Sequence, residues 1–234
     1  RKIRGTRECF TVDYSVMISG LIAAMPLTLA IMFTAMIAGI CLAMTAAALR
    51  VRRIPVISLL ADVYVSYARS VPVVLQLFVA FYGLPVFLSL FGITDFLSST
   101  VAAMVGLSFY HGGYLSEVIR PAYLAVDRGQ HEAAASLGYS FRQKFFRIVG
   151  PQATHIALPG YGNSIMYLIH NVALIMYIGA ADVMATAHLI MERDYNQYQF
   201  ETYLILAIIY SLMCLVAWLI VRFFEHRFAR SLRN

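Results

Sequence analysis

The sequence predicts an all-α membrane protein with five transmembrane helices in one domain. Of its 234 residues, 61% are hydrophobic and only 13% are charged, and the mean hydropathy is +0.73. A soluble domain would carry about 25% charged residues, so lipid is expected to cover much of this chain. No charged residue lies between Asp13 and Arg50, a run that exceeds the roughly 20 residues needed to cross a bilayer. Because this run is short for two spans and a turn, we expect one long, tilted helix, bent near Pro26.

Four further apolar segments follow the first span. Arg50, Arg52 and Arg53 close that span, and the segment from Ile54 to Leu60 is expected to run along or into the membrane. The other spans are expected at residues 70–91, 100–116, 154–181 and 202–221, and a polar loop with a short helix at residues 182–201. The chain then divides into an N-terminal arm (1–13), one transmembrane domain (14–229) with a two-helix loop at residues 121–151, and a tail (230–234).

Two pairs of opposite charges have spacings that bring them to one face of a helix. Glu117 and Arg120 are three residues apart and are expected to bond where the chain leaves the bilayer. Asp62 and Arg69 are seven residues apart. They either pair near the interface or lie there as two separate charges.

The basic residues are distributed unevenly between the two sides that five spans would create. On one side, the Arg50–Arg53 loop, the 121–151 region with Arg120, and the C-terminal segment from Arg222 onward carry 3, 5 and 4 basic residues, whereas the opposite loops hold only Arg193. Because Lys and Arg are retained on the cytoplasmic side, we expect a multi-pass membrane protein with a cytoplasmic C-terminus. The basic N-terminal arm would then lie outside, either along the outer headgroups or in a position set by further upstream sequence.

The loop at residues 121–151 is the most polar helical part of the chain. Residues 132–137 are rich in alanine and favour a helix, and Gly138 stands where a helix end needs a residue free to adopt a positive φ. Ser140 and Gln143 have the spacing of a capping box, which predicts the start of a second short helix that ends at Gly150-Pro151. The pattern therefore predicts two short helices joined by a glycine.

This loop resembles the EAA loop of permease subunits in ABC importers. The likeness rests on Glu132-Ala133-Ala134, on Gly138 a few residues later, and on a hydrophobic residue and Pro151 at the end. Other stretches resemble the polar amino-acid branch of that family, and the similarity extends roughly from Tyr14 to Glu225. These stretches are residues 69–78, 82–85, 117–120, 151–153, 157–159 and 162–163. The resemblance implies the type I importer permease fold, with a cytoplasmic coupling loop between the third and fourth spans.

The resemblance also implies partners rather than a cofactor in this chain. No G-x-x-x-x-G-K-[ST] nucleotide-binding loop is present, so ATP and Mg would be bound by two ABC ATPase subunits. A second permease, identical or homologous, would complete the pathway in the lipid, and an extracytoplasmic solute-binding protein would deliver the amino acid. The residues expected to couple to the ATPase are Glu132, Ala133, Ala134, Gly138, Arg142, Lys144, Arg147 and Pro151.

Polar side chains within the spans are the candidates for a substrate path, because burying them in a membrane is costly unless they face a cavity or a partner. They are Gln76, Tyr110, His111, Glu117, Asn163, His170 and Asn171. For each of them, a hydrogen bond in helix packing is the alternative interpretation. Gly112 and Gly113 favour either close helix packing or a substrate path in the third span.

The cargo predicted from the resemblance is a polar amino acid or a close analogue. Amino-acid members of the family usually have a Lys-Asp/Asn-Thr/Ser-Ser/Ala-Leu run where this chain has His170-Asn171-Val172-Ala173-Leu174. The absence of the lysine and of a hydroxyl residue disfavours glutamine, histidine or arginine. A less common polar or sulphur-containing amino acid, such as cystine, is left open as the cargo.

Other classes of function find little support in the residues. The net charge of +6 comes from basic residues beside apolar runs, which indicates membrane topology rather than nucleic-acid binding. The three cysteines have no metal-like spacing, so no metal site is expected, and no catalytic residue is predicted. An intramembrane enzyme using His111 or His170 with Glu117 would lack the H-E-x-x-H spacing, and a secondary transporter is disfavoured by the absence of an internal repeat.

Overall fold

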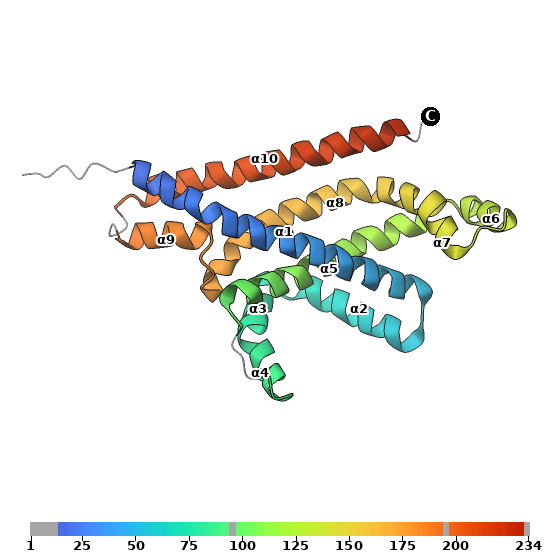
Figure 1. Ribbon diagram of the computed structural model, residues 1–234, viewed down its shortest axis with the longest axis horizontal. Coiled ribbons are helices and arrows are strands. Elements are labelled where there is room, and N and C mark those ends of the chain that lie inside the picture. The colour runs from blue at the N-terminus through green and yellow to red at the C-terminus, as the bar shows by residue number, and fades with distance from the viewer. Residues whose placement is uncertain (1–13, 94–96, 194–196, 232–234) are drawn as a thin grey trace, which may run out of the picture.

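The computed structural model describes residues 14–93, 97–193 and 197–231, and within these ranges every regular element is a helix (Figure 1). In chain order the elements are α1 (Tyr14–Arg52), α2 (Pro55–Ser70), α3 (Val73–Phe78), the π-helical η1 (Val79–Gly83), α4 (Leu84–Ser89), α5 (Ser99–Leu124), α6 (Arg128–Ser136), α7 (Phe141–Lys144), the π-helical η2 (Phe145–Val149), α8 (Gly150–Val172), the 3-10 helix η3 (Ala173–Ile178), α9 (Val183–Arg193) and α10 (Gln199–Ser231).

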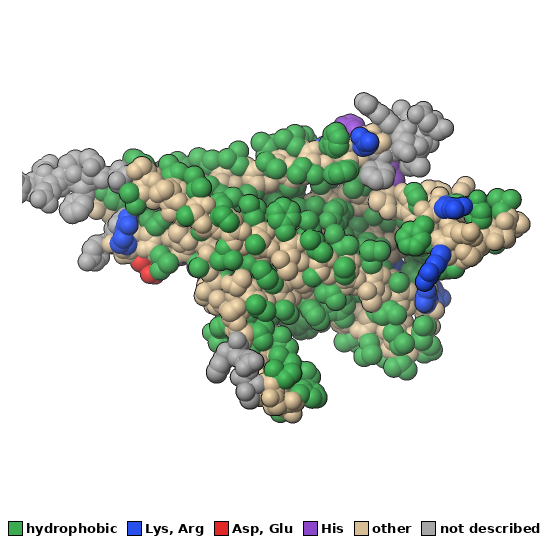
Figure 2. Space-filling model, viewed as in Figure 1, with side chains coloured by type: hydrophobic (Ala, Val, Ile, Leu, Met, Phe, Trp, Pro, Cys, Tyr) green, Lys and Arg blue, Asp and Glu red, His purple; other side chains and the backbone are tan. Residues whose placement is uncertain are grey.

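The long helices extend along the molecule, and the coupling loop lies at one end. The loop helices α6 and α7, the α1–α2 turn and the C-terminal end of α10 share that end in Figure 1. On the face shown in Figure 2, hydrophobic side chains cover the middle and Lys and Arg side chains lie towards the ends. This distribution is that of a body surrounded by lipid with its charges at the two interfaces.

The first predicted span is confirmed as one helix. The helix α1 is 39 residues long and contains Pro26 in its interior. Two helices of the described chain, α1 and the 199–227 part of α10, are each long and apolar enough to cross a membrane. The polar loop after the fourth predicted span contains α9, as expected.

The second predicted span has a different course. Residues 55–70 form a complete helix that turns back from α1, instead of a short segment over residues 54–60. The chain then bends by 117° between α2 and the α3–η1–α4 segment, so the helix does not run on from Ser70. The cause is Pro72, which favours an extended preceding residue, and Val71 has φ −91° and ψ 130°.

The structure therefore does not contain five separate apolar spans among its described residues. Besides the two helices above, two bent pairs qualify as spans only when each pair is counted together: α2 with α3–α4, and residues 141–178 with α9 at 51°. The helix α5, which was expected to be the third span, has 26 residues and lies packed against α1, α2 and α8. Because α5 is covered by protein, it carries polar residues such as Ser108, His111 and Ser116 that are all buried.

The main hydrophobic core forms where α1, α3, α5, α8 and η3 meet. Its buried members are Ile31, Met32, Ala35, Leu77, Ala102, Ala103, Leu107, Leu168, Ile169, Val172, Ile175, Ile178 and Ala180. Small residues allow the helices around α5 to approach closely. A Cβ added at Gly113 would lie 2.2 Å from Ala68 Cβ, and one added at Gly39 would lie 2.7 Å from His111 Cδ2. The packing alternative for Gly113 is therefore the one that the structure supports.

We expect Gly113→Ala to lower the free energy of unfolding by about 1–3 kcal/mol, because the new methyl group would overlap Ala68. Gly20→Ala is the matched control, since its Cβ would meet Ile190 Cδ1 at an ordinary 3.5 Å. The control is expected to be neutral or stabilising, because alanine favours a helix over glycine. Thermal unfolding of both variants in detergent measures the difference. Equal stabilities would contradict the close packing of α2 on α5.

Candidate functional site

The first helix of the 121–151 loop begins about one turn before Glu132, where the sequence predicts its helical run. The helix α6 starts at Arg128, and the Asp127 side chain caps it by accepting a hydrogen bond from the Gly129 N–H at 2.7 Å. An aspartate at a helix start is a recognisable N-cap, so Asp127 was the signal that could have found this boundary. Because it starts at Arg128, α6 has nine residues and includes Glu132, Ala133 and Ala134.

The end of α6 is closed as predicted. Gly138 has φ +71°, and its N–H donates to Ala135 O at 3.0 Å while the Tyr139 N–H donates to Ala134 O at 3.0 Å. This pair of bonds is the Schellman motif, which satisfies carbonyl groups that would otherwise lack a partner. The capping box is also confirmed: Ser140 N–H donates to Gln143 Oε1 at 2.9 Å, and Gln143 N–H donates to Ser140 Oγ at 3.3 Å. Local bonds thus fix the turn between α6 and α7.

The second loop helix does not end at Gly150-Pro151, as the sequence suggested, but continues into α8. A π-helical segment, η2, lies directly before the proline, and the Gly150 N–H donates to Phe145 O, five residues back. A Cβ at Gly150 would lie 2.6 Å from that oxygen, so glycine is needed there. Pro151 is then tolerated in the first turn of α8, where its missing N–H costs little. As a result, one helical rod extends from Phe141 to Val172.

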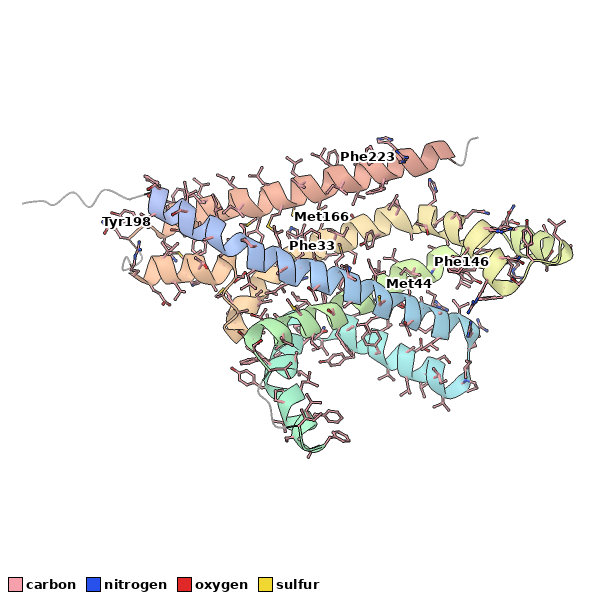
Figure 3. All side chains as sticks on the ribbon, viewed as in Figure 1. Phe33, Met44, Phe146, Met166, Tyr198 and Phe223 are labelled. Carbon is pink, nitrogen blue, oxygen red and sulfur yellow. The ribbon has the colours of Figure 1, made fainter. Side chains whose placement is uncertain are left out.

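The outer surface of the loop is partly hydrophobic. Leu137, Phe141 and Phe146 are 73%, 57% and 73% exposed, and Figure 3 labels Phe146 at this end of the molecule. Of the predicted coupling residues, Ala134 is buried and Lys144 is half-buried, whereas the others are exposed or, like Gly138, lie in the turn. The exposed apolar side chains were not singled out from the sequence. They give the loop an exposed surface that is partly apolar.

Contacts with the rest of the chain hold the loop in place. Tyr123 near the end of α5 stacks edge-on to His131 of α6, with ring centroids 5.7 Å apart, and lies 6.4 Å from the ring of Phe145. The Arg52 guanidinium at the end of α1 lies 5.6 Å from the centre of the Phe141 ring. The loop is therefore attached to both α1 and α5 as well as being continuous with α8.

The polar residues proposed for a substrate path separate into several places. Gln76 is buried, and its Nε2 donates to Ala68 O at 3.0 Å and to Val71 O at 2.8 Å. This side chain closes the end of α2 at the Pro72 bend, so its observed role is structural. It also borders an apolar cavity of about 370 Å³ between α2, α3–α4 and α5.

A second group connects α5 to α8. Asn171 Nδ2 donates to Tyr110 Oη at 3.0 Å, and the His111 Nδ1 and Ser164 Oγ atoms are 3.2 Å apart. His111 is fully buried, and its Nε2 has no hydrogen-bond partner. His170 points to a different neighbour and lies exposed, with its Nε2 3.6 Å from Cys214 Sγ on α10. Of the seven candidates, only Tyr110 and Asn171 bond to each other.

The remaining charged candidate, Glu117, belongs to an ion cluster that joins three helices. Arg50 of α1 bonds Asp62 of α2 through Nε at 2.6 Å and Glu117 of α5 through Nη1 at 2.5 Å, and Arg69 Nη1 lies 3.2 Å from the second Glu117 oxygen. Neither Asp62–Arg69 nor Glu117–Arg120 forms the pair that its spacing suggested. The reason is that Arg50, distant in sequence, folds beside both carboxylates. The cluster borders a cavity of about 530 Å³.

Comparison with known proteins assigns the chain to a family. Residues 39–230 match the model of the binding-protein-dependent transport system inner membrane component. The chain is 35% identical to the probable amino-acid permease protein YxeN of Bacillus subtilis (strain 168) over 96% of this chain and 99% of that protein. It is 32% identical to the L-cystine transport system permease protein TcyL of the same organism, over 90% of this chain and 88% of that protein.

Solved structures have the same fold. One described as an amino acid ABC transporter with histidines superposes with a TM-score of 0.78 at 31% identity, over 93% of this chain and 99% of that chain. An inward-facing MetNI methionine ABC transporter superposes with a TM-score of 0.69 at 19% identity, over 88% and 97%. The chain is thus a membrane permease of the binding-protein-dependent ABC importer class. It belongs to the binding-protein-dependent transport system inner membrane component family, and the resemblance drawn from the sequence is confirmed.

We expect the ion cluster to stabilise the junction of α1, α2 and α5. A double-mutant cycle of Arg50→Gln and Glu117→Gln should give a coupling energy of about 1–3 kcal/mol, because Arg50 is 14% exposed and removal of either partner leaves a poorly hydrated charge. The matched control is the exposed Arg222–Glu225 pair at 3.4 Å, where the coupling should stay below about 0.5 kcal/mol. Unfolding in detergent measures both cycles. Equal coupling in the two pairs would be evidence against a stabilising cluster.

Proposed function

We propose that this chain is the permease of an amino-acid importer and that the loop from Asp127 to Gly150 transmits ATP-driven motion to the transmembrane helices. The observation that carries the proposal is the unbroken helix from Phe141 to Val172 behind a loop closed by local hydrogen bonds. A force on α6 or α7 would reach the core residues of α8 along one continuous helix, which contains Pro159 in its interior. The relatives named above for amino-acid transport support the same function.

The partners are two ABC ATPase subunits docked on the loop, a second permease, and an extracytoplasmic solute-binding protein. The exposed Leu137, Phe141 and Phe146 would be buried in a groove of the ATPase, and Arg142 and Arg147 beside them would orient the contact through their charge. The permease itself binds no nucleotide and catalyses no reaction; ATP and Mg belong to the partner. A second permease is needed because the polar candidates of one chain do not surround one common cavity.

We infer the orientation of the chain in the membrane from the distribution of its basic residues. The coupling loop, the α1–α2 turn and the C-terminal end of α10 share one end of the molecule, and their sequences hold most of the basic residues. The positive-inside rule supports a cytoplasmic location for this end and for the C-terminus, in a bacterial cytoplasmic membrane. In this arrangement α5 and the two bent pairs complete the crossing of the bilayer together with α1 and α10.

The cargo is a polar or sulphur-containing amino acid such as cystine. The 32% identity to the L-cystine permease TcyL supports this class. Within the chain, Tyr110 and Asn171 form a hydrogen-bonded pair where the family's lysine-containing run is replaced by His170-Asn171. A hydroxyl and an amide of this kind would contact a zwitterionic solute without requiring a fixed countercharge.

The first functional prediction concerns coupling. Gly138→Val should reduce amino-acid-stimulated ATP hydrolysis by the assembled complex about fivefold or more, because a β-branched residue resists the left-handed φ of the loop turn. Gly92→Val is the matched control: Gly92 has φ +79°, and neither glycine has an atom within 4 Å of an added Cβ. The two variants therefore carry the same backbone strain at different places. A similar loss of coupling in both variants, or in neither, would contradict the assigned role.

The second functional prediction concerns cargo and energy source. In proteoliposomes with the solute-binding protein, one amino acid from a panel that includes cystine should stimulate ATP hydrolysis and accumulate inside. A complex with an ATPase subunit unable to hydrolyse ATP should show no accumulation. Uptake that persists with the inactive ATPase would identify a secondary transporter instead, and stimulation by no amino acid would refute the proposed cargo class.

A further inference from the structure

A groove of about 550 Å³ separates α8 from α10 at the end of the molecule that carries the coupling loop. Its lining residues are His155, Leu158, Pro159, Gly162, Asn163 and Met166 of α8 and Trp218, Val221, Arg222, Glu225 and His226 of α10. The two helices touch where a Cβ on Gly162 would lie 2.7 Å from Val221 Cγ1. Beyond this contact they separate towards the C-terminal end of α10, as Figure 1 shows.

The groove has an apolar part and a polar end. Leu158, Met166 and Val221 line the apolar part, whereas His155 and His226 lie near the start of α8 and the end of α10. The neighbouring surface of α10 is hydrophobic, with only 11% of its apolar window buried in the chain. A ligand that matches both parts must combine a hydrocarbon chain with a polar group.

The polar end of the groove is lined by one arginine and one glutamate, Arg222 and Glu225, beside the two histidines. The Arg222 guanidinium lies 5.5 Å from the centre of the Trp218 ring, and its Nη1 is 3.4 Å from Glu225 Oε2. With half of its side chain exposed, Arg222 retains N–H groups for a further acceptor. A phosphate beside Arg222 would have the complementary charge and geometry.

We propose that this groove binds an anionic phospholipid, with the phosphate at Arg222 between His155 and His226 and one acyl chain along Leu158 and Met166. An arginine in a pocket between transmembrane helices on the cytoplasmic side favours such a headgroup, and tryptophan favours the same interfacial depth. The lipid would fill the space between α10 and the rod that carries the coupling loop. The assignment to the cytoplasmic leaflet rests on the proposed orientation, whereas the binding site itself does not depend on transport.

Trp218 is the only tryptophan of the sequence and lies in the groove, so it reports occupancy directly. The experiment reconstitutes the full chain, without ATPase subunits, in bilayers of phosphatidylcholine and phosphatidylglycerol, with either one lipid or the other brominated. At equal mole fraction, brominated phosphatidylglycerol should quench Trp218 with an apparent binding constant about fivefold higher than brominated phosphatidylcholine, the contribution expected from one arginine.

Variants distinguish the contribution of Arg222 to the lipid preference from the contribution of other surface charges. Arg222→Gln should remove the preference, Arg222→Lys should retain most of it, and Arg53→Gln, an exposed arginine of the α1–α2 turn, should leave it unchanged. Equal quenching by both lipids, or a preference that survives Arg222→Gln, would overturn the proposal. The absence of quenching by either lipid would also overturn it, because protein would then cover the groove. Displacement of the brominated phosphatidylglycerol by inorganic phosphate would support the contact between the headgroup phosphate and Arg222. None of these readouts requires transport, so a failed transport assay leaves this test intact.

Discussion

The continuity of the helix from Phe141 to Val172 is the constraint on which the proposed coupling depends. A proline in the interior of a regular helix costs roughly 3 kcal/mol, and Pro151 lies within this rod. The chain avoids that cost because η2 shifts the hydrogen-bond register one residue before the proline, with Gly150 donating to Phe145 O. The same sequence feature that suggests a helix end therefore produces a continuous connection between the loop and the core.

The fold also depends on the position of α5 at the centre of the bundle. Its polar residues would be expensive in lipid, but α1, α2 and α8 surround them. His111 meets Ser164, Tyr110 meets Asn171, and Glu117 meets Arg50. Glycines allow this close packing, and the coupling loop follows directly from the end of α5. The loop is thus connected at both of its ends to helices that form the core.

Local features of the coupling site could be predicted from the sequence, because they depend on residues a few positions apart. The positive φ of Gly138 and the Ser140–Gln143 capping box are both of this kind. The bend at Pro72 has an equally local cause and lies close to Ser70, where the second span was expected to begin, but the complete helix over residues 55–70 before it was expected only as a short segment over residues 54–60. The hydropathy of α5 also does not reveal its position in the bundle, because a helix that is covered by protein need not be as apolar as one that faces lipid.

Interactions between distant segments could not be predicted in the same way. Arg50 and Glu117 are 67 residues apart, and helical spacing instead suggested partners on the same helix. The candidate path residues likewise fell into separate contacts, because their grouping depends on how α5, α8 and α10 pack. These side chains therefore form no common path within the described part of the chain, and the proposed second permease would have to complete one.

The most direct test of the coupling mechanism is the amount of amino acid transported per ATP hydrolysed after two glycines are inserted between Val149 and Gly150. This insertion breaks the rod but leaves α6, α7 and their exposed residues unchanged. We expect the ATPase subunits still to bind and hydrolyse ATP, while the uptake of amino acid per ATP falls sharply. Unchanged uptake per ATP in the variant would contradict the central claim that a continuous helix carries the motion from the loop to the membrane.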